Sequence, residues 1–211
     1  MNLGRPFLYP IVDTDVCRAR GVDPIAVAEA YLSGGARVLQ LRHKAGSSAM
    51  FLELADSLVT LARPVDATVI INDRADIARL SGAGGVHVGQ DDLSPSDVRK
   101  VAGDAIVVGL STHDAPQIDA ALGSEASYVA VGPIFGTTTK ETGYAARGLD
   151  LIGHATGRGK PIVAIGGITL DRVPELVRAG ATGIAVISDL FAGTDPEART
   201  REFIARLAEF S

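Results

Sequence analysis

The feature that most constrains the fold of this chain is a regular alternation of short apolar segments with longer, helix-like ones. Most of the apolar segments are too short for helices, and they are rich in Val and Ile, which is typical of strands buried on both faces. They span Phe7–Val12, Arg37–Leu41, Thr68–Ile71, Gly85–Val88, Ile106–Gly109, Tyr128–Val131, Ile162–Ile165 and Gly183–Ile187. Helices are predicted over Pro24–Ser33, Ser48–Ala62, Ala75–Ser81, Ser94–Val101, Ala115–Gly123, Leu149–Thr156, Leu170–Ala179 and Pro196–Phe210.

Eight predicted strands that alternate with eight predicted helices restrict the architecture to two folds. Parallel strands joined by helices form either a closed barrel or an open, doubly wound sheet. The 211 residues provide about 26 for each unit, which is enough for a strand, a helix and short loops. Because the units are regular and no linker interrupts them, we expect one α/β domain over residues 1–211, a (β/α)8 TIM barrel.

The charge and composition of the chain exclude several classes of function. A net charge of −5 and a pI of about 5.3 leave no basic excess for nucleic acid as the main partner. No run of about 18 apolar residues predicts a membrane span. Residues 1–10 lack the pattern of a secretory signal, and the single cysteine, Cys17, cannot form an intrachain disulfide. We therefore expect a cytoplasmic protein with small-molecule partners.

In a (β/α)8 barrel, ligand-binding groups lie where the strands end and the following loops begin. At these positions the chain collects cations, carboxylates, hydroxyl groups and glycines, a set suited to phosphorylated ligands. In chain order they are Gln40, Arg42 and Lys44; Asn72 and Asp73; Asp91 and Asp92; Ser111 and His113; Thr137, Thr138, Thr139 and Lys140; Gly166 and Gly167; and Ile187 and Ser188.

The second predicted strand ends in two cations. Alternation along a strand places Gln40, Arg42 and Lys44 on one side and Leu41 on the other, and it points His43 away from the cations. On an exposed helix such cations would be solubilising charges. At the end of a buried barrel strand, we interpret Arg42 and Lys44 as functional groups.

Two carboxylates follow adjacent strands. Asp73 or Asp92 alone would be interpreted as the cap of the following helix. Together on one rim, beside several cations, they indicate a magnesium site, because Mg²⁺ typically takes one or two carboxylates plus phosphate oxygens and water. Asp91 competes with Asp92 for this role, and spacing does not choose between them.

Two loops near the end of the chain match a recurrent phosphate site of barrels. Gly167 follows the seventh strand, and Ile187 and Ser188 end the eighth. Glycine lets the backbone approach an anion closely. The long polar loop over residues 134–148 is of the kind that closes over a ligand, and it would deliver Thr137, Thr139 and Lys140 onto phosphate. The alternative is a surface loop with incidental threonines.

The histidines give weaker signals. His87 lies inside a strand and is interpreted as a hydrogen-bonded core residue, whereas His113 is the credible acid–base candidate. The inventory as a whole implies two phosphate sites. Cations, carboxylates and magnesium suit a diphosphate, and the last two loops suit a monophosphate. For an enzyme that holds both ligands together, we expect a transferase with diphosphate as the leaving group.

Seven strings in this order resemble the thiamine phosphate synthase family through nearly the whole chain. They are Gln-Leu-Arg-His-Lys (40–44), Ile-Asn-Asp-Arg-Ala-Asp (71–76), Gly-Val-His-Val-Gly-Gln-Asp-Asp-Leu (85–93), Gly-Leu-Ser-Thr-His (109–113), Val-Gly-Pro-Ile-Phe-Gly-Thr-Thr-Thr-Lys (131–140), Ala-Ile-Gly-Gly-Ile (164–168) and Ala-Val-Ile-Ser (185–188). The resemblance implies a reaction that joins hydroxymethylpyrimidine diphosphate to a thiazole phosphate, with or without a carboxylate, and gives thiamine phosphate and diphosphate.

The resemblance also implies a role for each matching residue. The pyrimidine diphosphate would contact the segment Gln40, Leu41, Arg42, His43 and Lys44, together with Asn72, Ser111 and Lys140. The thiazole phosphate would contact Thr137, Thr138, Thr139, Gly167, Ile187 and Ser188. By the family pattern Asp73 and Asp92 would hold Mg²⁺, and Arg42, Lys44, Ser111 and Lys140 would be catalytic, since no enzymic nucleophile is needed.

Two alternatives remain open at this point. A related thiazole tautomerase would share the barrel and the monophosphate site and would use His113 as its acid–base group. It would have no need for the complete diphosphate and magnesium set, which favours the synthase. A non-catalytic sensor of phosphorylated ligands would bind without turnover, and fold alone does not exclude it. No pattern in the chain indicates its oligomeric state.

Overall fold

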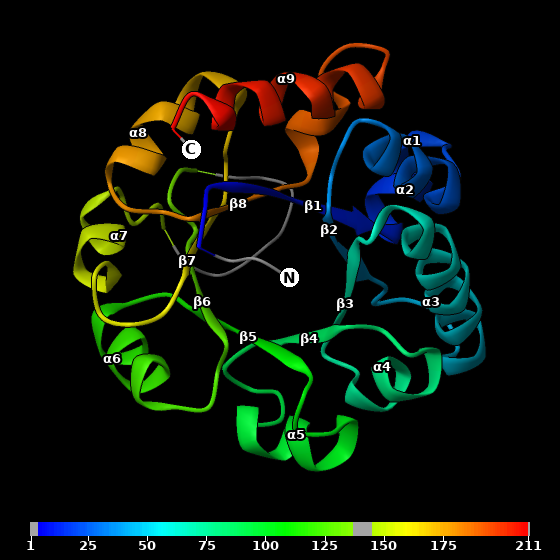
Figure 1. Cartoon of the computed structure of the whole chain (residues 1–211), viewed down its shortest axis with the longest axis horizontal. Helices are drawn as coiled ribbons and strands as arrows, with labels where there is room; N and C mark the ends of the chain where they lie inside the picture. Colours follow the sequence, from blue (N-terminus) through cyan, green and yellow to red (C-terminus); the bar gives the residue numbers. More distant parts are fainter. Residues whose placement is uncertain (1–3, 137–144, 211) are drawn as a thin grey trace.

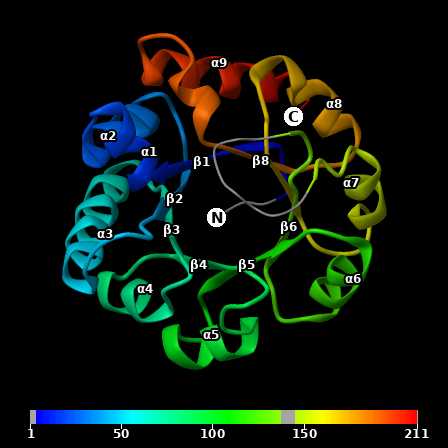
Figure 2. The same ribbon diagram turned by 180° about the vertical axis from the view of Figure 1, so that it is seen from behind.

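The structure is a computed structural model that describes residues 4–136 and 145–210. Its strands form a ring, and the helices surround that ring from outside in both views (Figure 1, Figure 2). The elements are β1 (Phe7–Asp13), α1 (Thr14–Arg20), α2 (Pro24–Ser33), β2 (Val38–Arg42), α3 (Ser48–Ala62), η1 (Arg63–Val65), β3 (Thr68–Asn72), α4 (Ala75–Ser81), β4 (Gly85–Val88), α5 (Pro95–Ala102), β5 (Val107–Thr112), α6 (Ala115–Gly123), β6 (Tyr128–Val131), α7 (Asp150–Ala155), β7 (Ile162–Ile165), η2 (Leu170–Arg172), α8 (Val173–Arg178), β8 (Gly183–Val186), η3 (Ser188–Phe191) and α9 (Pro196–Ala208).

The strands pair in sequence order and close into a barrel. Each strand lies parallel to the next, and β8 pairs with β1, with Phe7 opposite Gly183. This closure confirms the predicted (β/α)8 barrel and excludes the open, doubly wound sheet. Across the described ranges, no helix has both the length and the apolar character needed to cross a membrane.

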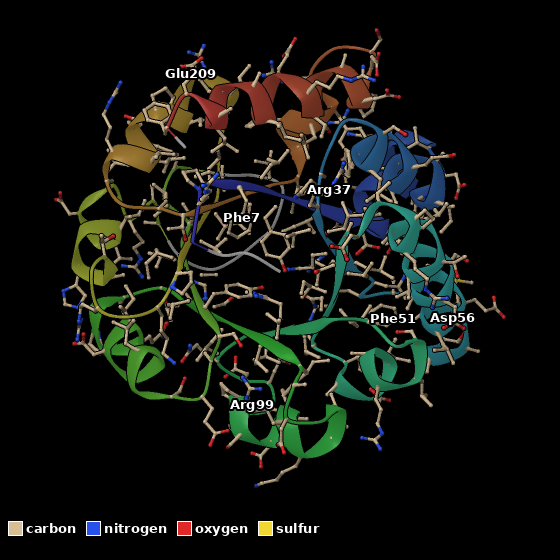
Figure 3. All side chains as sticks on the ribbon, in the orientation of Figure 1. Phe7, Arg37, Phe51, Asp56, Arg99 and Glu209 are labelled. Atoms are coloured by element: carbon tan, nitrogen blue, oxygen red, sulfur yellow. The ribbon has the colours of Figure 1, made fainter. Side chains whose placement is uncertain are left out.

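Alternation along the strands builds two cores. In β1, Leu8 and Val12 pack outward against the helices, while Tyr9 and Ile11 point into the barrel. The outer core contains many of the fully buried Ile, Leu and Val side chains, whereas the inner one includes two tyrosines. Figure 3 shows side chains filling the ring of strands, with Asp56 and Glu209 on the outer surface.

One glycine shapes the interior of the barrel. A Cβ atom at Gly109 of β5 would lie 2.1 Å from the Tyr128 ring and 2.5 Å from His87 Nδ1, both far inside van der Waals contact. Gly109 stands opposite His87 in β4 and opposite Tyr128 in β6. The missing side chain therefore provides the space in which the two larger side chains on neighbouring strands meet.

Within the described residues, the structure adds one α-helix that the sequence pattern did not predict, besides the short 3₁₀ helices η1 and η3. Helix α1 follows β1 directly, because the Asp13 carboxylate accepts hydrogen bonds from the N–H groups of Asp15 and Val16 and Gly21 ends the helix in the left-handed conformation. Its seven residues were too few to show a clear period.

Several predicted boundaries also change, most of them by one or two residues, and three of the changes have a clear structural setting. Strand β5 continues to Thr112, whose hydroxyl donates to the carbonyl of Ala130 at 2.9 Å inside the sheet. The helix predicted over 170–179 is divided into η2 and α8. The division lies where Pro174, which has no N–H to donate, interrupts the hydrogen-bond ladder. The eighth strand ends at Val186, so Ile187 follows the strand and occupies the N-cap position of the short helix η3, without a side-chain hydrogen bond.

Candidate active site

A buried ion pair holds the guanidinium of Arg42 at the end of β2. Its Nη1 donates to the Asp13 carboxylate at 2.6 Å, and the two side chains are 14% and 5% exposed. The Nε atom of Arg42 is also buried and has no hydrogen-bond partner among the described residues. Since Asp13 also caps α1, the position of Arg42 depends on how that helix begins. The Arg42 side chain also lines a cavity, where its guanidinium would meet an anion.

Lys44 and two carboxylates form the next part of the rim. The ammonium of Lys44 donates to the Asp73 carboxylate in a short ion pair, and both side chains are at least partly exposed. Burial raises the pKa of Asp73, the Lys44 hydrogen bond opposes this, and the neighbouring Asp92 carboxylate raises it again. Asp92 is fixed in turn, because its Oδ2 accepts from the N–H of Gly89 at 2.8 Å.

The structure bears on two questions about these aspartates: whether they cap helices, and whether Asp91 or Asp92 lies beside Asp73. Neither caps a helix, because α4 begins after Arg74 without a side-chain cap and α5 is capped by Ser94. Asp91 and Asp92 are both exposed, but the carboxylate that interacts with Asp73 is that of Asp92. Two carboxylates that repel each other beside cations fit a divalent cation that takes few protein ligands. The described residues contain no group of three or more His, Cys, Asp or Glu side chains able to hold a metal ion.

Polar side chains line a cavity inside the barrel. Gln40, Arg42, Asn72 and Ser111 reach this cavity from β2, β3 and β5, and Ile187 borders it after β8, so the structure brings together five of the predicted residues. The amide of Gln40 is fixed by a hydrogen bond to Tyr9 at 3.0 Å. A flat ring with nitrogen atoms at its edge would find amide and hydroxyl groups here.

A second cavity adjoins the first and has a different lining. Gly167, Ile187 and Ser188 border it, and so does Ser111. Ser111 and Ile187 line both cavities and therefore lie at their boundary. Gly166 and Gly167 both adopt positive φ angles, 102° and 61°. A Cβ atom at Gly167 would lie 2.4 Å from the carbonyl oxygen of residue 136, so the close turn requires glycine.

The remaining predicted residues are distributed differently. Leu41 is fully buried between the sheet and the helices, and His43 packs against Phe51 of α3 while its Nδ1 shares a hydrogen bond with Thr14 at 2.9 Å. His113 lines the second cavity, and its Nδ1 lies 2.6 Å from the carbonyl oxygen of Gly132. The residues outside the described ranges are Thr137, Thr138, Thr139 and Lys140.

Sequence reasoning missed two residues beside the site. Asp13, the partner of Arg42, was not singled out, and His87 was assigned to the core without a link to the rim. His87 is buried and hydrogen-bonded, as expected, but its Nε2 lies 2.8 Å from the hydroxyl of Ser111. The alternation of Val86 and Val88 with His87 could have shown that its ring points into the barrel.

Comparison with known proteins gives a consistent result. The family model described as thiamine monophosphate synthase matches residues 8–190. The thiamine-phosphate synthase of Koribacter versatilis is 42% identical over 210 residues and covers 96% of each chain. That of Laribacter hongkongensis is 40% identical and covers 94% of this chain and 93% of its own. The chain belongs to the thiamine monophosphate synthase family.

The family is also found among solved structures. Thiamine phosphate pyrophosphorylase from Pyrococcus furiosus superimposes with a TM-score of 0.88 at 28% identity, covering 99% of this chain and 98% of its own. N-(5'-phosphoribosyl)anthranilate isomerase from the same organism shares the fold, with a TM-score of 0.69 at 15% identity. The part matched by the thiamine monophosphate synthase model contains both cavities and every predicted site residue.

Proposed function

We propose that this protein is a thiamine-phosphate synthase, a transferase that joins hydroxymethylpyrimidine diphosphate to a thiazole phosphate. Relatives that cover almost the whole chain carry this name. The observation that carries the proposal is the arrangement of two cavities around Ser111. One has amides and a cation, with carboxylates nearby, and the other has a glycine-lined wall. Two phosphorylated substrates would therefore meet where a bond between them can form.

The first cavity suits the pyrimidine diphosphate. Gln40 and Asn72 would hold the ring, and Arg42 and Lys44 would bind the diphosphate, with Lys140 reaching it from the loop outside the described residues. The preorganised guanidinium of Arg42, held by buried Asp13, faces charge that grows as diphosphate departs. Such fixed donors stabilise the transition state more than the bound substrate.

The second cavity suits the thiazole phosphate. The backbone N–H groups near Gly167 and Ser188 would bind its phosphate, assisted by Thr137, Thr138 and Thr139. The aminopyrimidine stabilises positive charge on its methylene carbon, so the carbon–oxygen bond breaks first and the diphosphate oxygen keeps the electron pair. The thiazole nitrogen then forms the new carbon–nitrogen bond. No side chain of the protein has to act as a nucleophile.

Asp73 and Asp92 would hold Mg²⁺ in this proposal. The fit rests on two oxygen ligands that interact with each other at the rim, next to the residues assigned to diphosphate. When bound, the ion would neutralise charge on the departing diphosphate. Lys44, which pairs with Asp73 in the structure, would turn its ammonium toward the diphosphate once the carboxylate has another partner.

The test mixes purified protein with hydroxymethylpyrimidine diphosphate, a thiazole phosphate and magnesium, and follows thiamine phosphate by fluorescence after oxidation. Product that disappears on addition of EDTA is the expected result. Binding of the thiazole phosphate without product would instead favour the tautomerase chemistry of His113, or a sensor. The two are separated by adding a thiazole carboxylate phosphate and following its proton shift by NMR.

A further inference from the structure

A chain of buried hydrogen bonds crosses the interior of the barrel and ends at the candidate active site. The Gln40 amide nitrogen donates to the Tyr9 hydroxyl at 3.0 Å, and that hydroxyl lies 2.9 Å from the Tyr128 hydroxyl. The Tyr128 hydroxyl lies 2.9 Å from His87 Nδ1, and His87 Nε2 lies 2.8 Å from the Ser111 hydroxyl. Five side chains from five different strands are thus linked in one path.

The hydrogen bonds along this path all run in the same donor-to-acceptor direction, because the Gln40 amide at its start is a donor. Since the Gln40 amide donates to Tyr9, the Tyr9 hydroxyl accepts there and has its own hydrogen left for Tyr128. Tyr128 then accepts from Tyr9 and gives its hydrogen to His87 Nδ1. A neutral imidazole that accepts at Nδ1 carries its hydrogen on Nε2, from which it donates to the Ser111 oxygen.

The surroundings preserve this order. Burial and the neighbouring Tyr9 raise the pKa of Tyr128, and burial raises that of Tyr9, so both phenols keep the hydrogens that the path requires. The His87 and Tyr128 rings stack with their centroids 5.7 Å apart. They fit together because Gly109 has no Cβ atom in the space between them. The contact is therefore specified by packing as well as by hydrogen bonding.

We infer that His87 and Tyr128 are positioning residues that leave the Ser111 hydroxyl hydrogen directed into the cavity as a donor to the substrate. The inference rests on the proposed function, because it assigns a partner to that hydrogen. With its oxygen occupied by the His87 N–H, Ser111 faces an acceptor, either a ring nitrogen of the pyrimidine or an oxygen of the departing diphosphate. Ser111 touches substrate, whereas His87 and Tyr128 act through it.

The order of the hydrogens is tested without any turnover. Nitrogen-15 NMR of the histidine side chains distinguishes the Nε2–H tautomer from the Nδ1–H tautomer, and a His87→Gln variant assigns the signal. Wild-type protein should show His87 as Nε2–H. Tyr128→Phe removes the donor to Nδ1 and should give a mixture of tautomers. Tyr9→Phe is the matched control. It removes an equally buried hydroxyl, but the buried Tyr128 hydroxyl keeps His87 Nδ1 as the acceptor for its hydrogen, so the tautomer should not change.

Kinetics then tests the effect on Ser111. Tyr128→Phe should lower kcat by about tenfold, the effect of one misdirected hydrogen bond, with little change in KM. Tyr9→Phe should instead raise the KM for the pyrimidine diphosphate, because it frees Gln40, and should leave kcat within about twofold. In a Ser111→Ala background, the further substitution of Tyr128 should have no effect on kcat.

The outcomes separate this inference from the proposed function. A wild-type protein that makes no thiamine phosphate, yet shows the Nε2–H tautomer, contradicts the proposed function and leaves the hydrogen order standing. An active wild type with His87 as Nδ1–H overturns the inference. So does a Tyr128→Phe variant that melts like wild type and lowers kcat equally with and without the Ser111 hydroxyl, because its effect then bypasses Ser111.

Discussion

Replacing Asp13 by Asn should expose how strongly the buried ion pair holds Arg42. The carboxylate has two tasks, as the acceptor for Arg42 at 2.6 Å and as the cap of α1. Asn keeps the capping oxygen but removes the charge, since Asn and Asp cap helices about equally well. Asp13→Asn therefore isolates the ion pair, and Asp13→Ala removes both functions.

The structure sets the magnitude. Both side chains are buried, so solvent screens the pair little, and an uncompensated charge on Arg42 should cost about 3 kcal/mol of unfolding free energy. Loss of the cap in Asp13→Ala should cost about 1 kcal/mol more. For a domain of this size, Asp13→Asn should lower the melting temperature by about 6–12 °C.

Urea and thermal unfolding measure these losses, and Asp15→Asn is the matched control. Asp15 belongs to the same helix and also pairs with an arginine, Arg18, but the side chains are 37% and 70% exposed. Its substitution should change the unfolding free energy by less than about 0.5 kcal/mol. If Asp13→Asn is as mild as this control, the ion-pair account is wrong. If Asp13→Ala is no worse than Asp13→Asn, the capping role of Asp13 is wrong.

Three further predictions concern the metal site, the phosphate loop and the cysteine. Asp92→Ala should cut magnesium-dependent turnover by at least about 100-fold without unfolding the protein, whereas Asp91→Ala should retain it, as measured by titration of the assay with Mg²⁺. Gly167→Ala should weaken thiazole phosphate binding in calorimetry and destabilise the fold by more than Gly157→Ala, whose added Cβ would have the same left-handed strain but open space around it. Burial, with a smaller contribution from nearby aspartates, raises the pKa of Cys17 to about 11. Its thiol should react with DTNB slowly until the protein unfolds, and the associated stability should be present below about pH 8.5 and be lost as the pH rises through 11.

The barrel could be predicted from the sequence because its strands are fully buried. Runs such as Ile162–Ile165 are apolar on both faces, and this pattern, repeated along the chain, leaves few architectures. Helix α1 could not be predicted in this way, because it depends on the Asp13 cap and is too short to show a period. Strand β5 was predicted too short because Ser111 and Thr112 are polar. In the structure Ser111 faces a cavity, and the Thr112 hydroxyl donates to the Ala130 carbonyl.

The sequence pointed to the residues of the candidate site, but it did not predict which of them contact one another. Alternation placed Gln40, Arg42 and Lys44 on one side of the strand. In the structure Gln40 and Arg42 line the interior cavity, whereas Lys44 lies beyond the end of β2, is half exposed and pairs with Asp73. Which carboxylate lies beside Asp73 depends on how the loop after β4 turns, and spacing alone left two choices. The contact between His87 and Ser111 depends on the register of neighbouring strands, which a single sequence does not reveal.

The absence of a side chain at Gly109 has a consequence for how the sequences of related chains can diverge. The Tyr128 ring from the next strand occupies the place of a Cβ atom at Gly109, so the large side chain at 128 fills the volume that the missing side chain at 109 leaves. A larger residue at 109 is tolerated only after 128 has become smaller, and a small residue at 128 alone leaves a void. The two positions should therefore change together or not at all, and each single step between the two solutions passes through a less stable protein.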